Sequence, residues 1–134
     1  MDTLKIRLEH WEAMRAHVAR EAPLEACGLL AGSEGLSASV FPIRNEEASL
    51  THFLMDAKQQ VQAFMAMERA GCHLLAIYHS HPAGPPRPSR TDLAEVTYPG
   101  VVQLIWAQAG GWDCFAFLLD EGQVQPLKYQ LLSE

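Results

Sequence analysis

Apolar and polar positions along this chain repeat with two periods, which separate predicted strands from predicted helices. Leu4, Ile6 and Leu8 alternate with polar neighbours, and this period of two predicts a short first strand. From residue 9 to residue 22 the apolar positions recur at helical spacing, and Pro23 marks the end of the predicted helix. The chain therefore begins with a strand followed by an amphipathic helix.

A second helix is predicted in the middle of the chain. Asp56 can cap its N-terminus, and Gly71 can close its C-terminus. The apolar residues Val61, Phe64 and Met65 lie at helical spacing and predict the stripe that faces the core. This segment has clearer boundaries than the first helix.

The remaining apolar runs predict strands with turns between them, and a short helix follows a proline-rich loop. No linker or repeat divides the chain, so we expect one domain over residues 1–134. The fold class is mixed α/β, with helices packed on a mostly antiparallel sheet that has one central apolar strand. The expected strands are residues 27–31, 36–43, 74–78, 101–106, 112–119 and 123–129, and the short helix is 90–97.

Composition excludes several classes of protein. The chain has 134 residues with 49% hydrophobic and 19% charged residues, which excludes a disordered chain. Its formal charge of -6 argues against a nucleic-acid surface, because phosphate binding needs clustered Lys and Arg. No window reaches the ~18 apolar residues of a membrane span, and residues 1–7 lack the apolar core of a signal peptide. We therefore expect a cytoplasmic protein that binds neither nucleic acid nor membrane.

The cysteines suggest packing rather than chemistry. Cys27, Cys72 and Cys114 form no CxxC pair, so we expect buried thiols. A Cys27–Cys72 or a Cys72–Cys114 bridge stays open as an alternative, although the cytoplasm disfavours it. Two histidines of the first helix, His10 and His17, are expected at the surface.

The chemistry concentrates between residues 78 and 93. His79 and His81 end the central apolar run, and alternate residues of a strand point to the same face, so both imidazoles can reach one cation. Asp92 follows after a loop stiffened by prolines and can supply an oxygen. Three protein ligands with a fourth position open are typical of catalytic zinc. Two structural histidines at a strand end are the alternative interpretation.

Ser89 and Glu25 complete the candidate site. Ser89 with Asp92 matches a helix N-cap followed by an acid, and the same position would put a hydroxyl beside the metal. Glu25 precedes an apolar strand, an unusual place for a charge, and is the best candidate for the base that takes a proton from water. A solvated glutamate is the alternative, and other candidate acids are Glu46, Glu47, Glu95 and Asp56.

Together these residues resemble the JAMM, or MPN-plus, metalloprotease family, in its compact prokaryotic branch. The family motif is a glutamate on an early strand, then His-x-His, seven residues and Ser-x-x-Asp, which Glu25, His79, His81, Ser89 and Asp92 match without departure. The resemblance implies a cytidine deaminase-like three-layer sandwich. It implies one zinc ion per chain held by His79, His81 and Asp92, with Glu25 as general acid/base and Ser89 stabilising the oxyanion.

The family resemblance also implies a reaction. Family members cut isopeptide or peptide bonds after the C-terminal Gly-Gly of a ubiquitin-like modifier, so the expected partner is such a protein, or a β-grasp sulfur carrier, and its conjugates. Two alternatives stay open. One is a non-catalytic binding scaffold of the MPN type, and the other is a deaminase or DNA-repair relative, although the deaminase pattern H-x-E with P-C-x-x-C is missing. The oligomeric state stays open.

Overall fold

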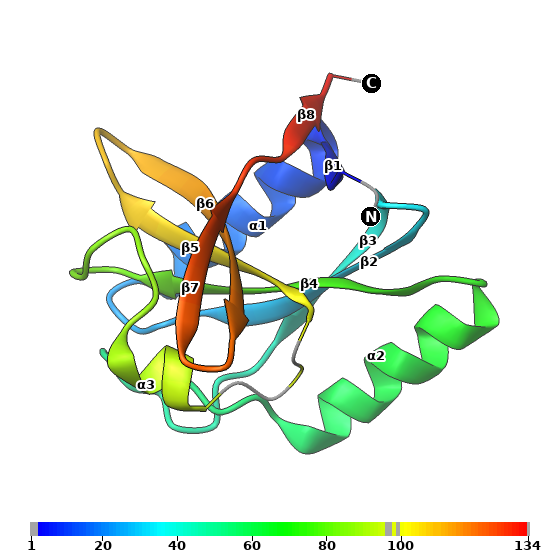
Figure 1. Ribbon diagram of the computed structural model, residues 1–134. Helices are drawn as coiled ribbons and strands as arrows, with labels where there is room; N and C mark the ends of the chain where they lie inside the picture. Colours follow the sequence, from blue (N-terminus) through cyan, green and yellow to red (C-terminus); the bar gives the residue numbers. More distant parts are fainter. Residues whose placement is uncertain (1–2, 96–97, 99, 134) are drawn as a thin grey trace.

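The computed structural model describes residues 3–95, 98 and 100–133, which form one mixed sheet with helices on both faces (Figure 1). Within these residues the strands lie in the order β7-β6-β5-β4-β2-β3-β1-β8. Pairs β2–β3, β2–β4, β5–β6 and β6–β7 are antiparallel, whereas β4–β5, β1–β3 and β1–β8 are parallel. The elements in chain order are β1 (Lys5–Arg7), α1 (Leu8–Glu21), β2 (Cys27–Ser33), β3 (Leu36–Ile43), α2 (Ala57–Arg69), β4 (His73–His81), α3 (Arg90–Ala94), β5 (Val102–Gln108), β6 (Trp112–Asp120), β7 (Gln123–Leu127) and β8 (Gln130–Leu132). This arrangement confirms the expected mixed α/β class.

Strand β4 lies in the middle of the sheet and separates two layers of helix. Its side chains alternate between the faces, so Tyr78 packs in one core cluster with Val18 of α1. Ile77 packs in a second cluster with Ala63 and Met67 of α2. Figure 1 shows α1 and α2 on opposite sides of the sheet. The result is a three-layer sandwich around a sheet that is covered on both faces.

The two edges of the sheet approach each other. Strands β7 and β8 lie at opposite ends of the strand order, yet two residues connect them, a link that spans at most about 10 Å. The sheet must therefore curl. Tyr129 in this link accepts a hydrogen bond from Trp11 Nε1 at 3.1 Å and donates one to Cys114 O at 2.8 Å. The strand expected over residues 123–129 is confirmed over Gln123–Leu127, but it ends two residues earlier, because the chain leaves one edge there and joins the other.

The stripe predicted for α2 is wrong. Val61 and Met65 are 58% and 52% exposed, whereas Ala63 and Met67 are buried and Phe64 is partly buried. Apolar residues lie on nearly every side of this helix, so their spacing could not select the face. A small alanine in the contact lets the helix approach the sheet closely. The N-cap was correct, since Asp56 accepts a hydrogen bond from Gln59 N at 3.1 Å.

The remaining expectations are confirmed at some residues and wrong at others. His17 is buried, with Nδ1 at 2.7 Å from the Tyr78 hydroxyl, so its expected surface position was wrong. Cys27 and Cys114 are buried free thiols, and Cys72 is a partly buried one. The short helix begins as expected at Arg90, but Thr97 lies outside the described residues. In the part of the chain that the structure describes, no helix is long and apolar enough to cross a membrane.

Candidate active site

Strand β4 carries both histidines of the motif into the interior. His79 lies opposite Cys27 of β2 and Ile105 of β5, so strands flank it on both sides. His79 and His81 share the face that α2 covers, and Ser80 between them points to the other face. The two histidines are only 1% and 6% exposed. The expectation that both rings leave the strand together is confirmed.

Three ligand atoms converge from β4 and from the start of α3. His79 Nε2 and His81 Nε2 are 3.0 Å apart, and Asp92 Oδ2 lies 3.2 Å from the first and 3.0 Å from the second. Tetrahedral zinc binds N and O atoms at roughly 2.0–2.2 Å, so two of its ligands are separated by about 3.3 Å. The triangle is close to this size. The donor set therefore fits one small divalent cation.

The neighbours of the imidazoles orient their lone pairs inward. His81 Nδ1 is 3.0 Å from the carbonyl oxygen of Pro85, which can only accept, so Nδ1 carries the proton and Nε2 has a lone pair. The ring of Phe53 stacks on His79 with centroids 4.5 Å apart and an angle of 29°. Among the described residues, the buried His79 Nδ1 has no hydrogen-bond partner. Both Nε2 atoms are thereby directed at the same point.

Ser89 and Asp92 are joined at the N-terminus of α3. Ser89 Oγ accepts from Asp92 N at 3.0 Å, and Asp92 Oδ2 accepts from Ser89 N at 2.8 Å, which is a capping box. The N-cap interpretation of Ser89 is confirmed. Because its oxygen is the acceptor in this contact, the hydroxyl hydrogen can still donate to another group.

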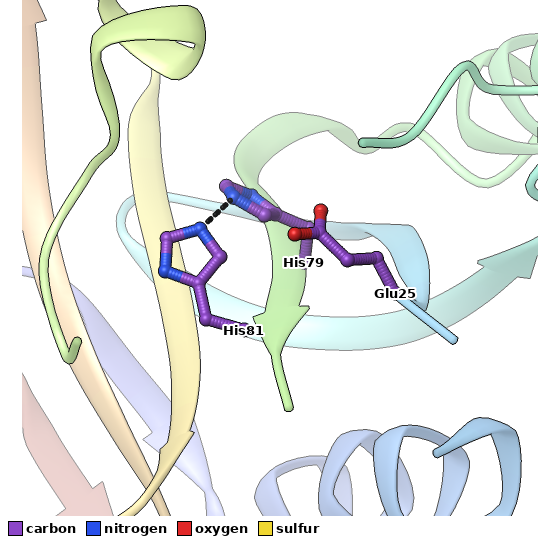
Figure 2. Close-up of side chains that lie close together, drawn as sticks. All are labelled: Glu25, His79 and His81. Carbon is purple, nitrogen blue, oxygen red and sulfur yellow. Dashed lines mark hydrogen bonds between the residues drawn. The ribbon is translucent and has the colours of Figure 1, made fainter. Parts of the chain in front are cut away.

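Glu25 points its carboxylate at the two histidines (Figure 2). Its ligand atom and those of His79 and His81 all lie within 4.8 Å of one another. Main-chain contacts hold the residue just before β2: its N–H donates to Ser49 O at 2.8 Å, and its carbonyl accepts from Asn45 Nδ2 at 3.0 Å. The side chain is buried, because the residue is 5% exposed.

Sequence reasoning missed Asn45. Its Nδ2 also donates to His52 O at 2.9 Å, and its Oδ1 accepts from Leu54 N at 2.9 Å. This amide therefore ties Glu25 to the loop that precedes α2. An Asn directly after a strand is a common turn residue, so the sequence offered no signal of a link between distant segments.

The environment shifts the pKa values of Glu25, His79 and Asp92 in different directions. Burial raises the pKa of Glu25 to about 7, with His81 opposing and Asp92 adding to the shift. Burial lowers the pKa of His79. For Asp92, burial raises the pKa, but hydrogen bonds with His79 and His81 outweigh it and hold that pKa well below its usual range. An ionised Asp92 beside a neutral His79 suits cation binding, and a carboxyl that titrates near neutrality can both take and release a proton.

A cavity of about 210 Å³ opens beside these ligand atoms, between the loop before α2, the start of α2, α3 and β5. We call it the active-site cavity. His79 and Asp92 belong to its lining, so a molecule inside it lies against the ligand set. Met55 and Ile77 contribute apolar surface, and Gln103 contributes a buried amide.

The other acids considered for the role of the base lie elsewhere in the structure or have other contacts. Asp56 caps α2 and forms an ion pair with Arg44 at 3.0 Å. Glu46 and Glu47 are exposed in the loop after β3, and Glu95 lines the active-site cavity. The residues that the structure brings together are the five expected ones, and of the candidate bases Glu25 is the one that lies beside both histidines.

The chain is similar to proteins that are named as peptidases or proteases. A probable TtuB-protein conjugate cleaving protease of Thermus thermophilus is 45% identical over 113 residues, which are 84% of this chain and 73% of that protein. The CysO-cysteine peptidase of Mycobacterium tuberculosis is 43% identical over 98 residues, 72% of this chain and 67% of that protein. A solved structure from Desulfitobacterium hafniense has a TM-score of 0.88 and 32% identity, covering 98% of this chain and 94% of that one.

The family itself follows from a sequence profile. The profile of the prokaryotic homologs of the JAB domain matches residues 7–118, well over half of the chain. Its match includes the elements that carry Glu25, His79, His81 and Asp92. The chain therefore belongs to the family of prokaryotic homologs of the JAB domain.

Proposed function

We propose that this protein is a zinc-dependent peptidase that hydrolyses the bond after the C-terminal Gly-Gly of a ubiquitin-like modifier or β-grasp sulfur carrier. The observation that carries the proposal is the convergence of His79 Nε2, His81 Nε2 and Asp92 Oδ2 beside the buried carboxyl of Glu25. Two imidazoles and a carboxylate, with room for a fourth ligand, are the donor set of catalytic zinc. One ion per chain is expected.

Zinc held by these residues would supply Lewis-acid chemistry, polarising the substrate carbonyl and lowering the pKa of water to roughly 7. Glu25 accepts the proton of the attacking water. Its pKa of about 7 suits the second half of the task as well, in which it gives that proton to the leaving amine.

Ser89 is proposed to stabilise the oxyanion of the tetrahedral intermediate. The capping box fixes its oxygen at the N-terminus of α3, and the hydroxyl hydrogen is left to donate. A donor that is held in place before the reaction costs no reorganisation when the negative charge develops.

The substrate class rests on the family and on the relatives. One relative is named for cleaving TtuB-protein conjugates and another for cleaving CysO-cysteine, so both are named for releasing a protein from something attached to it. We propose that the tail of the substrate protein lies extended in the active-site cavity, held by main-chain hydrogen bonds. Glycines next to the cut bond would let the tail approach the buried ligand atoms closely. A cytoplasmic location stays part of the proposal.

Metal analysis tests the donor set. Purified protein should hold one zinc ion per chain, and a His79→Ala/His81→Ala protein should hold none, whereas His73→Ala, an exposed histidine of the same strand, should hold one. Undiminished zinc in the double variant would contradict the assignment. Zinc binding without cleavage of any Gly-Gly fusion would support the non-catalytic scaffold instead.

A further inference from the structure

One amide side chain in the active-site cavity has no hydrogen-bond partner within the protein. Gln103 is 7% exposed, and among the described residues no hydrogen bond is made by its side-chain amide. The other buried amides and hydroxyls near the site are paired. Tyr98 donates its hydroxyl to Gln60 Oε1 at 3.1 Å, and Gln60 Nε2 donates to Met55 O at 3.2 Å. Of the two amide side chains in the described lining, Gln103 is therefore the one without a partner in the protein.

The polar atoms of Gln103 open to the cavity, because the fully buried unpaired side-chain atoms among the described residues are His79 Nδ1 and Trp106 Nε1. A polar group that faces a cavity rather than the core is explained most simply by a ligand that satisfies it.

The lining restricts what this ligand is. Glu95, the lining carboxylate other than the proposed zinc ligand Asp92, disfavours a carboxylate close to it. A peptide group is neutral and offers one N–H and one C=O, which match the Oε1 acceptor and Nε2 donor of Gln103. Met55 and Ile77 offer apolar contacts to a side chain next to that peptide group.

The register of β4 and β5 fixes the position of Gln103 relative to the proposed zinc ligand His79. Gln103 lies beside Ile77 on the neighbouring parallel strand, and His79 is two residues further along β4. Two residues of strand span about 6.6 Å, and two residues of an extended tail span the same length. A peptide group bound to Gln103 is therefore about two residues from the carbonyl that reacts near His79.

We propose that Gln103 is the residue that binds a main-chain peptide group of the substrate tail, on the N-terminal side of its Gly-Gly pair. The inference rests on the proposed function, which it deepens by assigning a recognition residue. Gln103 selects an extended, uncharged tail and sets its register, so that the carbonyl of the last glycine reaches the ligand set.

The first test separates this role from a structural one. Gln103→Met keeps the length of the side chain and removes its hydrogen bonds. The KM for a β-grasp protein fused through Gly-Gly to a reporter peptide should rise about tenfold while kcat stays within about twofold, as expected for one or two neutral hydrogen bonds. The melting temperature should be equal or higher, because the substitution removes no hydrogen bond within the protein. Gln108→Met, at the exposed end of the same strand, is the matched control and should change neither quantity.

The second test locates the bonded group. Six-residue tail peptides ending in Gly-Gly carry one ester in place of one peptide bond, which removes a single N–H. Their affinities are measured by calorimetry with Glu25→Gln protein and with the Glu25→Gln/Gln103→Met protein. One ester, near the first glycine, should weaken binding in the first protein and leave it unchanged in the second. Equal losses at every position in both proteins would overturn the inference.

The outcomes distinguish the two proposals. If the wild-type protein cleaves the Gly-Gly fusion and Gln103→Met cleaves it equally well, the role of Gln103 is wrong and the proposed function stands. A Gln103→Met protein that melts lower or fails to fold also overturns the inference, since the amide is then structural. If the wild-type protein cleaves no Gly-Gly fusion, the proposed function fails and the inference falls with it.

Discussion

The hydroxyl of Ser80, between the two histidines, accepts a hydrogen bond from the backbone N–H of Ala26 at 2.8 Å. Ala26 directly follows Glu25, and its carbonyl accepts from Ser80 N at 3.0 Å. Ser80 is fully buried and faces away from the ligand atoms. One residue of the motif thus fixes the main chain beside the base while its neighbours supply the imidazoles.

Ser80→Ala should lower activity without removing zinc. The change leaves the buried Ala26 N–H without an acceptor, which costs about 1–3 kcal/mol of stability. Glu25 then loses a fixed position, so kcat should fall more than KM rises. Urea unfolding, zinc content and steady-state kinetics measure the three effects. Ser80→Thr should restore most of the loss, and Ser33→Ala, an exposed serine of β2, is the control. Unchanged kcat in Ser80→Ala would show that this hydrogen bond does not position the base.

Glu25→Gln should keep its zinc and lose nearly all turnover. The amide has almost the same shape, but it cannot take the proton of the attacking water. Elemental analysis and a kinetic assay on the same sample measure both properties. Glu47→Gln, in the exposed loop after β3, is the matched control and should keep full activity. An active Glu25→Gln protein would mean that another residue is the base.

Ser89 has two roles that substitutions can separate. Ser89→Ala should reduce kcat by roughly 10–1000-fold through loss of an oxyanion donor, and it should also lose about 1 kcal/mol of capping energy. Ser89→Gly retains most of the capping energy, to within a few tenths of a kcal/mol, and lacks the hydroxyl. If kcat recovers in the glycine variant, Ser89 acts through the helix rather than through its hydroxyl.

His17 should make the stability of the protein depend on pH. Burial lowers the pKa of His17, Arg20 lowers it further, and Glu21 opposes the shift. The folded state therefore resists a proton that the unfolded chain accepts below its ordinary pKa of about 6.5. Stability from this residue is present above that pH and is lost as the pH falls below it.

Urea unfolding of metal-free protein between pH 5 and 8 tests this effect. The free energy of unfolding should fall more steeply towards acid in wild-type protein than in His17→Gln, which can still bond the Tyr78 hydroxyl. Parallel curves for the two proteins would show that His17 titrates equally in both states. Metal-free protein is needed because acid also releases ions from histidine ligands.

Features made by residues close together in the sequence could be predicted, whereas features that depend on distant parts of the chain could not. His79 and His81 share one strand, and Ser89 and Asp92 share one helix start, so their geometry is local and the spacing predicts it. The face of α2 was not predictable, because apolar residues surround that helix. Gln103 and Asn45 are ordinary polar residues in the sequence, and only their neighbours in the folded chain make them notable. The link through Tyr129 depends on the curl of the whole sheet.

The most direct measurement of the central claim is the intact mass of the products when zinc-loaded enzyme meets a β-grasp protein joined through Gly-Gly to a reporter peptide. The account predicts one cut, directly after the last glycine, that stops when a chelator removes the ion or when a bulky residue replaces that glycine. Cleavage at another bond, or equal cleavage of the Gly-Gly and bulky-tailed fusions, would contradict it.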